Sequence, residues 1–174
     1  MKETLEIERE WLVPSDVLIP ESLAIQKIKI TQMYLLSDKK ERLRISEFDN
    51  KKIYTHTIKR AAEGGGNWEL EREIDEKEFC KLVLGVDKNC YIILKERNVF
   101  YIDNTKYELD IFIHPLKIKI LEVEIPSFDT HVFIPEWLSG IIEVTNIKGF
   151  SNKRIATKPE VTLKKAKELF LNQS

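Results

Sequence analysis

The feature that most constrains this chain is a set of short segments in which charges of one sign recur at every second position. The first segment, Leu5 to Val13, carries Glu6, Glu8 and Glu10 in this way. Because side chains alternate across a β-strand, the three carboxylates would share one face at intervals of roughly 7 Å. Like charges at that spacing oppose folding unless water or a cation screens them. This strand face is therefore either solvated or filled by a cation.

Five further segments repeat the pattern, and each pair of charges keeps one sign. A surface selected only for solubility usually mixes signs, because like charges along or across strands are mildly destabilising. Separate acidic and basic pairs would suit a divalent cation bound beside a polyanion, since carboxylates bind Mg²⁺ or Mn²⁺ and basic groups bind phosphate oxygens. Solvated strand faces and a metal–polyphosphate site both remain open. The further pairs are Arg42/Arg44, Glu69/Glu71, Lys95/Arg97, Glu108/Asp110 and Glu122/Glu124.

Strand-like segments make up most of the chain. They are Leu5–Val13, about Ile25–Leu36, Arg42–Ile45, Ile53–Arg60, Trp68–Ile74, Tyr91–Val99, Tyr107–Ile113 and Ile118–Ile125. Many strands with few helices predict an α+β fold in which an antiparallel sheet can close into a barrel, and one face of every strand would then line a lumen. No internal boundary or linker interrupts the pattern, so we expect residues 1–174 to form a single domain.

Helix signals are few. Asp75 and Glu78 fit a capping box ahead of an apolar stripe. Proline at a helix start and glycine after its end bracket a second, brief helix. We expect helices over residues 75–84, over a short stretch between Pro135 and Gly140, and over about 160–172.

Charge and composition exclude several classes of partner. The 28 basic and 29 acidic residues leave a formal net charge of -1, so no overall field favours nucleic acid or an anionic membrane. No apolar run approaches the ~20 residues of a membrane span, and the first residues lack the apolar core of a signal peptide. Cys80 and Cys90 have no metal-ligand spacing, which favours reduced structural thiols. We therefore expect a cytoplasmic protein.

A longer series of motifs resembles one known family. The motifs are Glu6/Glu8, Gln32–Leu35, Arg42–Arg44, Thr57–Lys59, Glu69–Glu71, Lys95–Arg97, Glu108–Phe112, Leu121–Glu124, Pro135–Leu138, Glu143–Thr145 and Asn152–Lys153. In this order they resemble the CYTH domain of the triphosphate tunnel metalloenzymes over about residues 5–156. The resemblance implies an eight-stranded antiparallel closed β-barrel with short flanking helices and a C-terminal helix, whose charged lumen binds triphosphate and a divalent metal. Compact bacterial members are most often similar to inorganic triphosphatases. Other family activities are thiamine triphosphatase, adenylate cyclase and RNA 5′-triphosphatase.

The resemblance also implies roles for individual residues. It makes Glu6, Glu8, Glu122 and Glu124 ligands of Mg²⁺ or Mn²⁺, and it makes Arg42, Arg44, Lys59, Lys95, Arg97 and Lys148 ligands of the triphosphate. Glu6, Glu8 and Glu71 are the catalytic candidates for activating a metal-oriented water, without one being assigned as the base. Glu69 and Asp110 complete the acidic lining, while Tyr34 either contacts substrate or packs. The implied partner is a small triphosphate or polyphosphate bound by a monomer or homodimer, with no nucleic acid and no membrane.

One departure from the family motif concerns Glu10. The motif is ExExK, and this chain has glutamate where the lysine should be. At roughly 6 Å and an effective dielectric near 20, the lost attraction and the added repulsion are each on the order of 2 to 3 kcal/mol before screening. The sequence thus predicts a metal-dependent triphosphatase of weak or altered activity. The alternatives are a catalytically silent polyphosphate- or nucleotide-binding module, an adenylate cyclase, and a β-rich domain whose charge pairs face outward.

Overall fold

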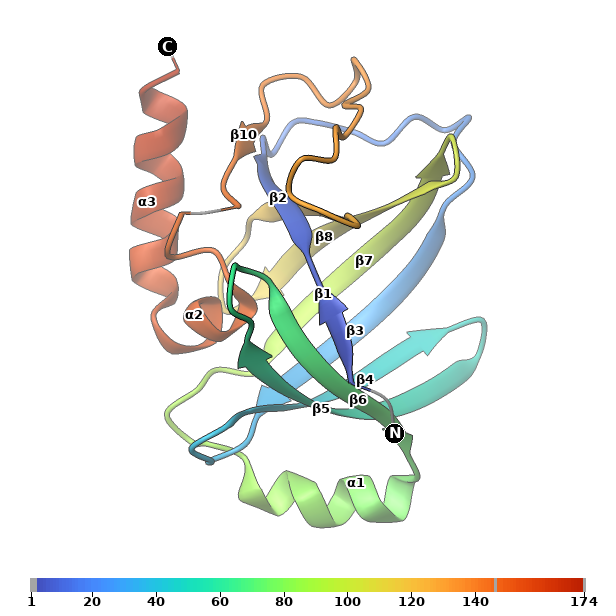
Figure 1. Ribbon diagram of the computed structural model, residues 1–174, viewed down its shortest axis with the longest axis vertical. Coiled ribbons are helices and arrows are strands. Elements are labelled where there is room, and N and C mark those ends of the chain that lie inside the picture. The colour runs from blue at the N-terminus through green and yellow to red at the C-terminus, as the bar shows by residue number, and fades with distance from the viewer. Residues whose placement is uncertain (1–2, 146, 174) are drawn as a thin grey trace.

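In a computed structural model of the protein, the described residues, 3–145 and 147–173, form one antiparallel sheet of ten strands with three α-helices beside it (Figure 1). The sheet order is β1-β6-β5-β4-β3-β7-β8-β9-β2-β10, and the sheet curls into a half-barrel. The strands are β1 (Thr4–Glu6), β2 (Glu8–Val13), β3 (Gln26–Tyr34), β4 (Lys40–Phe48), β5 (Lys51–Ala61), β6 (Asn67–Ile74), β7 (Ile93–Ile102), β8 (Thr105–His114), β9 (Lys119–Glu124) and β10 (Ile142–Glu143).

The predicted antiparallel sheet with few helices is confirmed, but the closed eight-stranded barrel is not. The segment expected as one strand, Leu5–Val13, divides at Ile7 into β1 and β2. β1 pairs with β6 at one end of the sheet order, while β2 pairs with β9 near the other end. The alternating pattern could not reveal this division, because it continues unchanged through Ile7. The short β10, which pairs with β2, was not predicted.

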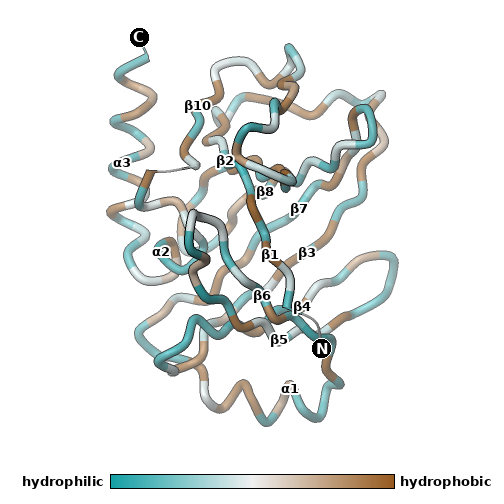
Figure 2. The backbone as a smooth tube through the Cα atoms, in the orientation of Figure 1, coloured by the Kyte–Doolittle hydropathy of each residue, from teal (hydrophilic) through white to brown (hydrophobic). Residues whose placement is uncertain are grey.

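The inner face of the sheet is charged over one part and apolar over the next. On β2, β8 and β9, an apolar residue stands two positions from a charged one and therefore shares its face. These apolar residues are Leu12, Phe112 and Ile120. All three are buried in a cluster with Ile155 and Ala166, which come from α2 (Asn152–Thr157) and α3 (Pro159–Leu171). Hydrophilic and hydrophobic stretches alternate along α3 (Figure 2). The two C-terminal helices therefore supply apolar side chains that adjoin the charged part of the interior.

The helices predicted over residues 75–84 and 160–172 are present, but the helix predicted between Pro135 and Gly140 is not. α1 (Glu76–Leu82) begins after Asp75, whose side chain accepts a hydrogen bond from the Glu78 amide at 2.7 Å, as the capping box predicts. α3 occupies the predicted C-terminal segment. No helix forms between Pro135 and Gly140; this stretch is a turn closed by a hydrogen bond from the Leu138 amide to the Pro135 carbonyl. The apolar side chain of Leu138, within this turn, is buried against the sheet.

Two further findings concern predictions from composition. Among the helices that the structure describes, none combines the length and apolar character needed to cross a membrane. Within the same residues Cys80 and Cys90 form no disulfide, and the first is exposed while the second is half-buried.

Candidate functional site: a charged cavity on the inner face of the sheet

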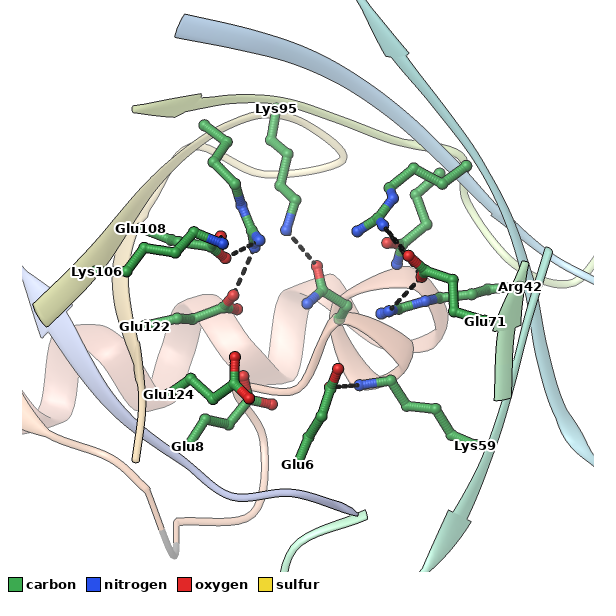
Figure 3. A pocket seen from close by; sticks show the side chains of 14 residues that line it. Glu6, Glu8, Arg42, Lys59, Glu71, Lys95, Lys106, Glu108, Glu122 and Glu124 are labelled. Carbon is green, nitrogen blue, oxygen red and sulfur yellow. Dashed lines mark hydrogen bonds and ion pairs between the residues drawn. The ribbon is translucent and has the colours of Figure 1, made fainter. Parts of the chain in front are cut away.

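The inner face of the curled sheet encloses a cavity of about 210 Å³ (Figure 3). Carboxylates of Glu8, Glu108 and Glu122 gather on one side, and Arg42 and Lys59 lie across from them. Same-sign pairs from different strands thus point inward, and the alternative of outward-facing pairs is wrong. The lining residues are Glu6, Glu8, Gln32, Arg42, Arg44, Lys59, Glu71, Lys95, Arg97, Lys106, Glu108, Glu122, Glu124 and Asn152.

The basic residues of β4 and β5 are held by carboxylates of β6. Arg42 Nη2 donates to Glu69 Oε2 at 3.2 Å, and Arg44 Nη2 donates to Glu71 Oε1 at 2.9 Å. Lys59 also forms an ion pair with Glu69. Glu71 accepts a further hydrogen bond from Thr57 at 2.7 Å. Both oxygens of Glu71 are therefore engaged, and this residue positions Arg44.

A buried ion network connects β7, β8 and β9. Asp110 is fully buried and pairs with Lys95 and with Arg97 Nε at 2.7 Å. Burial opposes the ionisation of Asp110, but Arg97 and Lys95 outweigh it and lower its pKa to about 2. Arg97 also donates to Glu122 at 2.5 Å, and burial lowers the pKa of Lys95. Asn152 at the start of α2 accepts a hydrogen bond from Lys95 at 3.1 Å.

The acidic side of the cavity carries more carboxylates than cations. Glu122 lies directly opposite Glu108 on one neighbouring strand and opposite Glu10 on the other, while Glu124 lies opposite Glu8. Within residues 3–145 and 147–173, Glu8, Glu10 and Glu124 form no ion pair. Burial and the charge of Glu122 raise the pKa of Glu8 to about 7 and that of Glu10 to about 8. Glu8 and Glu10 are therefore held partly in the neutral, protonated form near neutral pH, and a bound cation would favour their ionised form.

The donor chemistry of this side fits a divalent cation, although the side chains are not arranged as a finished metal site. No three acidic, histidine or cysteine side chains of the described chain converge closely enough to hold a metal. Carboxylate oxygens are nevertheless the ligands that Mg²⁺ and Mn²⁺ prefer. A cation beside Glu8 would also offset the burial and the repulsion from Glu122 that raise the Glu8 pKa.

The basic side carries donors that are not yet used. The buried Nε atoms of Arg42 and Arg44 have no hydrogen-bond partner among the described residues. Buried polar groups are almost always hydrogen-bonded, because leaving a donor unpaired costs free energy. The two arginines therefore retain donor capacity that an anion in the cavity can use once their side chains turn toward it.

The structure brings most of the predicted site residues together. All predicted metal ligands and all predicted triphosphate ligands except Lys148 line the cavity. Lys148 is exposed; it lies outside the cavity, and its carbonyl accepts a hydrogen bond from Lys165 at 2.6 Å. The prediction came from the resemblance, in which a basic residue stands at this position just before Asn152, but the chain turns through Gly149, at φ 136°, between the two residues.

Four predicted residues lie behind or beside the cavity wall. Glu69 and Asp110 are buried partners of cavity cations. Tyr34 is only 5% exposed, and its hydroxyl accepts a hydrogen bond from Gln32 at 3.0 Å, so packing describes it better than free access to substrate. Glu10 lines an adjoining hollow.

Sequence reasoning missed Lys106 as a lining residue. It stands two positions before Glu108 on β8 and forms an ion pair with it. Its sign is opposite to that of Glu108, so a search for same-sign pairs passes over it. Opposite signs also meet between strands, where Arg44 contacts Glu71 and Arg97 contacts Asp110. Charge segregation therefore does not hold across the cavity, and on β8 Lys106 breaks it along the strand as well.

The chain is similar to several solved structures. No protein-family model matches the chain, and no curated protein matches it. A candidate adenylate cyclase from Bacillus halodurans shares the fold at 19% identity, covering 73% of this chain and 83% of that chain with a TM-score of 0.50. The hypothetical protein NE1496 is 28% identical, covering 88% of this chain and 98% of that chain with a TM-score of 0.57. A second structure describes NE1496 as an inorganic triphosphatase and covers 89% of this chain and 96% of that chain, also with a TM-score of 0.57. The chain is therefore similar in fold to an inorganic triphosphatase, with 26% of aligned residues identical.

Proposed function

We propose that the chain is a member of the triphosphate tunnel metalloenzyme family that hydrolyses inorganic triphosphate, or a small organic triphosphate, with Mg²⁺ or Mn²⁺. One observation carries the proposal: a single cavity combines unpaired guanidinium N–H groups with unpaired carboxylates. A metal-bound polyphosphate presents the complementary charges. The similarity to a structure described as an inorganic triphosphatase supports the same reaction class.

The cavity residues divide into three tasks. Arg42 and Arg44 donate their free Nε–H groups to phosphate oxygens, and the cations from β5 and β7 neutralise the remaining charge. Glu6, Glu8, Glu122 and Glu124 would hold the divalent cation. When bound, that cation supplies charge neutralisation and an activated water. Because Glu71 is engaged by Arg44 and Thr57, Glu6 and Glu8 are the better candidates to accept the proton of the attacking water.

A second candidate function is triphosphate binding without turnover. Its supporting observation is Glu10, a carboxylate without an ion-pair partner in the described chain, directly opposite Glu122. Above its raised pKa of about 8, where Glu10 is ionised, its negative charge opposes a second anion nearby. Adenylate cyclase activity has the weaker support of shared fold alone.

A phosphate-release panel separates these functions. The wild-type protein is incubated with inorganic triphosphate, ATP or thiamine triphosphate, each with Mg²⁺, with Mn²⁺ and without metal. We expect metal-dependent release from at least one triphosphate, and a loss of about 100-fold in kcat/KM for Arg44→Met, because hydrogen bonds to charged groups contribute roughly 1.5–3 kcal/mol. Lys27→Met is the matched control, since Lys27 pairs with Glu96 away from the cavity.

The other outcomes of the panel are equally specific. Triphosphate binding without phosphate release would favour the silent module, and cyclic AMP formed from ATP would favour the cyclase. Neither binding nor release of any substrate would show the proposal to be wrong.

A further inference from the structure

A second hollow lies between α3 and the ends of three strands, and we name it the α3 cleft. It has a volume of about 670 Å³. α3 stands beside the sheet (Figure 1), and the cleft lies between this helix, the ends of β2 and β8, and the start of β9. None of the described residues that line the α3 cleft also lines the charged cavity. The α3 cleft is therefore a separate space.

The walls of the α3 cleft are mostly apolar. α3 contributes Leu163, Ala166 and Phe170, which recur at helical spacing and share one face of the helix with Lys167. Protein interiors are close-packed, and such an apolar stripe normally packs directly against its neighbours. Here the stripe borders an open space instead. Hollows of about 300–1,000 Å³ with mostly apolar walls and a few polar groups are typical of small-molecule sites.

Phe112 forms the wall between the α3 cleft and the charged cavity. Phe112 lines the cleft and is only 2% exposed. The centre of its ring lies 5.1 Å from Nζ of Lys95, which lines the charged cavity. A buried aromatic ring thus closes the cleft on that side, so a ligand in the cleft would not compete for space with an anion in the cavity.

Three lysines and one acidic residue, Asp16, give the α3 cleft a positive rim. Lys119 donates to the carbonyl oxygen of Ser15 at 2.6 Å, so it holds the loop that follows β2. Lys117 and Lys167 are exposed, and neither forms an ion pair or a side-chain hydrogen bond within residues 3–145 and 147–173. They come from different walls, the turn before β9 and α3. Two free ammonium groups at the edge of an apolar hollow are complementary to an anionic head on an apolar chain.

We infer that the α3 cleft binds a monocarboxylate with one long aliphatic chain, a ligand of the fatty-acid class, from solution. The chain lies along the apolar stripe of α3, and the carboxylate meets Lys117 and Lys167 at the rim. Removal of the chain from water supplies most of the affinity, and the two ammonium groups select the charge of the head. This site goes beyond the proposed function and does not depend on it.

Calorimetry with three probes tests the two contributions separately. The probes are decanoate; decyltrimethylammonium, which has the same chain length and the opposite charge; and butyrate, which has the same head and a short chain. All are used at neutral pH below the concentrations at which micelles form. We expect the wild type to bind decanoate roughly tenfold more tightly than decyltrimethylammonium, because only the carboxylate accepts charge-assisted hydrogen bonds from the lysines. Butyrate should bind at least about 100-fold more weakly than decanoate, since each methylene removed from water adds affinity.

Two variants remove the two contributions. Lys117→Gln/Lys167→Gln should reduce the preference for decanoate over decyltrimethylammonium from roughly tenfold to about twofold or less. Leu163→Trp should weaken the binding of both long-chain probes about tenfold, because the larger side chain fills the cleft. Lys39→Gln/Lys164→Gln is the matched control, since both lysines are exposed and lie outside the cleft. Thermal unfolding followed by circular dichroism verifies the fold of each variant, and the lysine variants, which change only exposed side chains, decide the matter if Leu163→Trp does not fold.

Several outcomes would overturn the inference. They are the absence of decanoate binding by the wild type, equal affinities for the two long-chain probes, and an unchanged preference in Lys117→Gln/Lys167→Gln. Binding to vesicles of anionic phospholipid but not to decanoate would assign this face to a membrane surface instead. A dimer that Leu163→Trp abolishes, seen by sedimentation in a protein that does not bind decanoate, would assign the cleft to a second copy of the chain. None of these results bears on the proposed triphosphate hydrolysis, which the phosphate-release panel tests by itself.

Discussion

Replacing Asp110 by asparagine is expected to lower the free energy of unfolding by about 3–5 kcal/mol, the cost of breaking a buried ion pair from one side. Asp110 is 0% exposed and Lys95 is 3% exposed, so the variant leaves a lysine and Arg97 in the interior without their shared carboxylate. Urea denaturation of the two proteins at neutral pH measures the difference.

The effect should depend on pH in a defined direction. The pKa of Asp110 is lowered from 3.8 to about 2 in the folded protein, so its ionised form stabilises the fold at every pH above its unfolded value. This contribution is lost as the pH falls through the folded value. The difference between wild type and variant should therefore shrink as the pH is lowered from 3.8 towards 2.

Glu143→Gln is the matched control for the Asp110 variant. Glu143 also pairs with an arginine, Arg9 at 2.6 Å, but its side chain is 41% exposed. Exposed ion pairs contribute about 0–1 kcal/mol, so this variant should lose little stability. A loss for Asp110→Asn no larger than that of Glu143→Gln would contradict the description of the network as a buried one.

Replacing Glu10 by lysine should strengthen the binding of triphosphate. The change removes a carboxylate that lies opposite Glu122 and supplies a cation facing the same hollow. Each of these two changes is worth on the order of 2 to 3 kcal/mol before screening by salt and water. After screening we expect affinity to rise by about 10- to 100-fold, equivalent to roughly 1.4–2.8 kcal/mol.

Calorimetry at a pH above the Glu10 pKa of about 8 gives the clearest measurement, because the wild-type carboxylate is then ionised. Glu10→Gln separates the two contributions, since it removes the negative charge without adding a positive one. Its affinity should lie between those of the wild type and the lysine variant. Identical affinities for all three proteins would mean that the side chain at position 10 does not face the bound anion.

Much of the fold and of the cavity could be predicted from alternation alone. Same-sign charges at every second position of a strand indicate a shared face, and residues such as Arg44 and Glu122 do line one cavity inside the curled sheet. The same rule gives no information on which strands become neighbours. It therefore could not indicate that Arg44 would contact Glu71 or that Arg97 would contact Asp110.

The remaining errors have local causes. α2 was not predicted from the sequence. It has only six residues, and no glutamate or glutamine stands three positions after its serine cap, Ser151, to mark a capping box. The stretch from Pro135 was predicted as a helix from its flanking proline and glycine, but a single turn is enough to bury Leu138 against the sheet. Lys148 was predicted as a ligand because it falls, just before Asn152, where the family has another basic residue; a match along the sequence carries no information on where a loop places a side chain, and this one lies outside the cavity.

The most direct test of the central claim, that one cavity binds triphosphate and a divalent cation side by side, is the affinity for inorganic triphosphate measured by calorimetry at increasing Mn²⁺ concentration. The account predicts that Mn²⁺ tightens triphosphate binding and that triphosphate tightens Mn²⁺ binding by the same factor, as linkage requires. It also predicts that Glu124→Gln, which removes one of the unpaired carboxylates, reduces this factor. Triphosphate affinity that is independent of Mn²⁺, or the absence of binding at every Mn²⁺ concentration, would contradict the account.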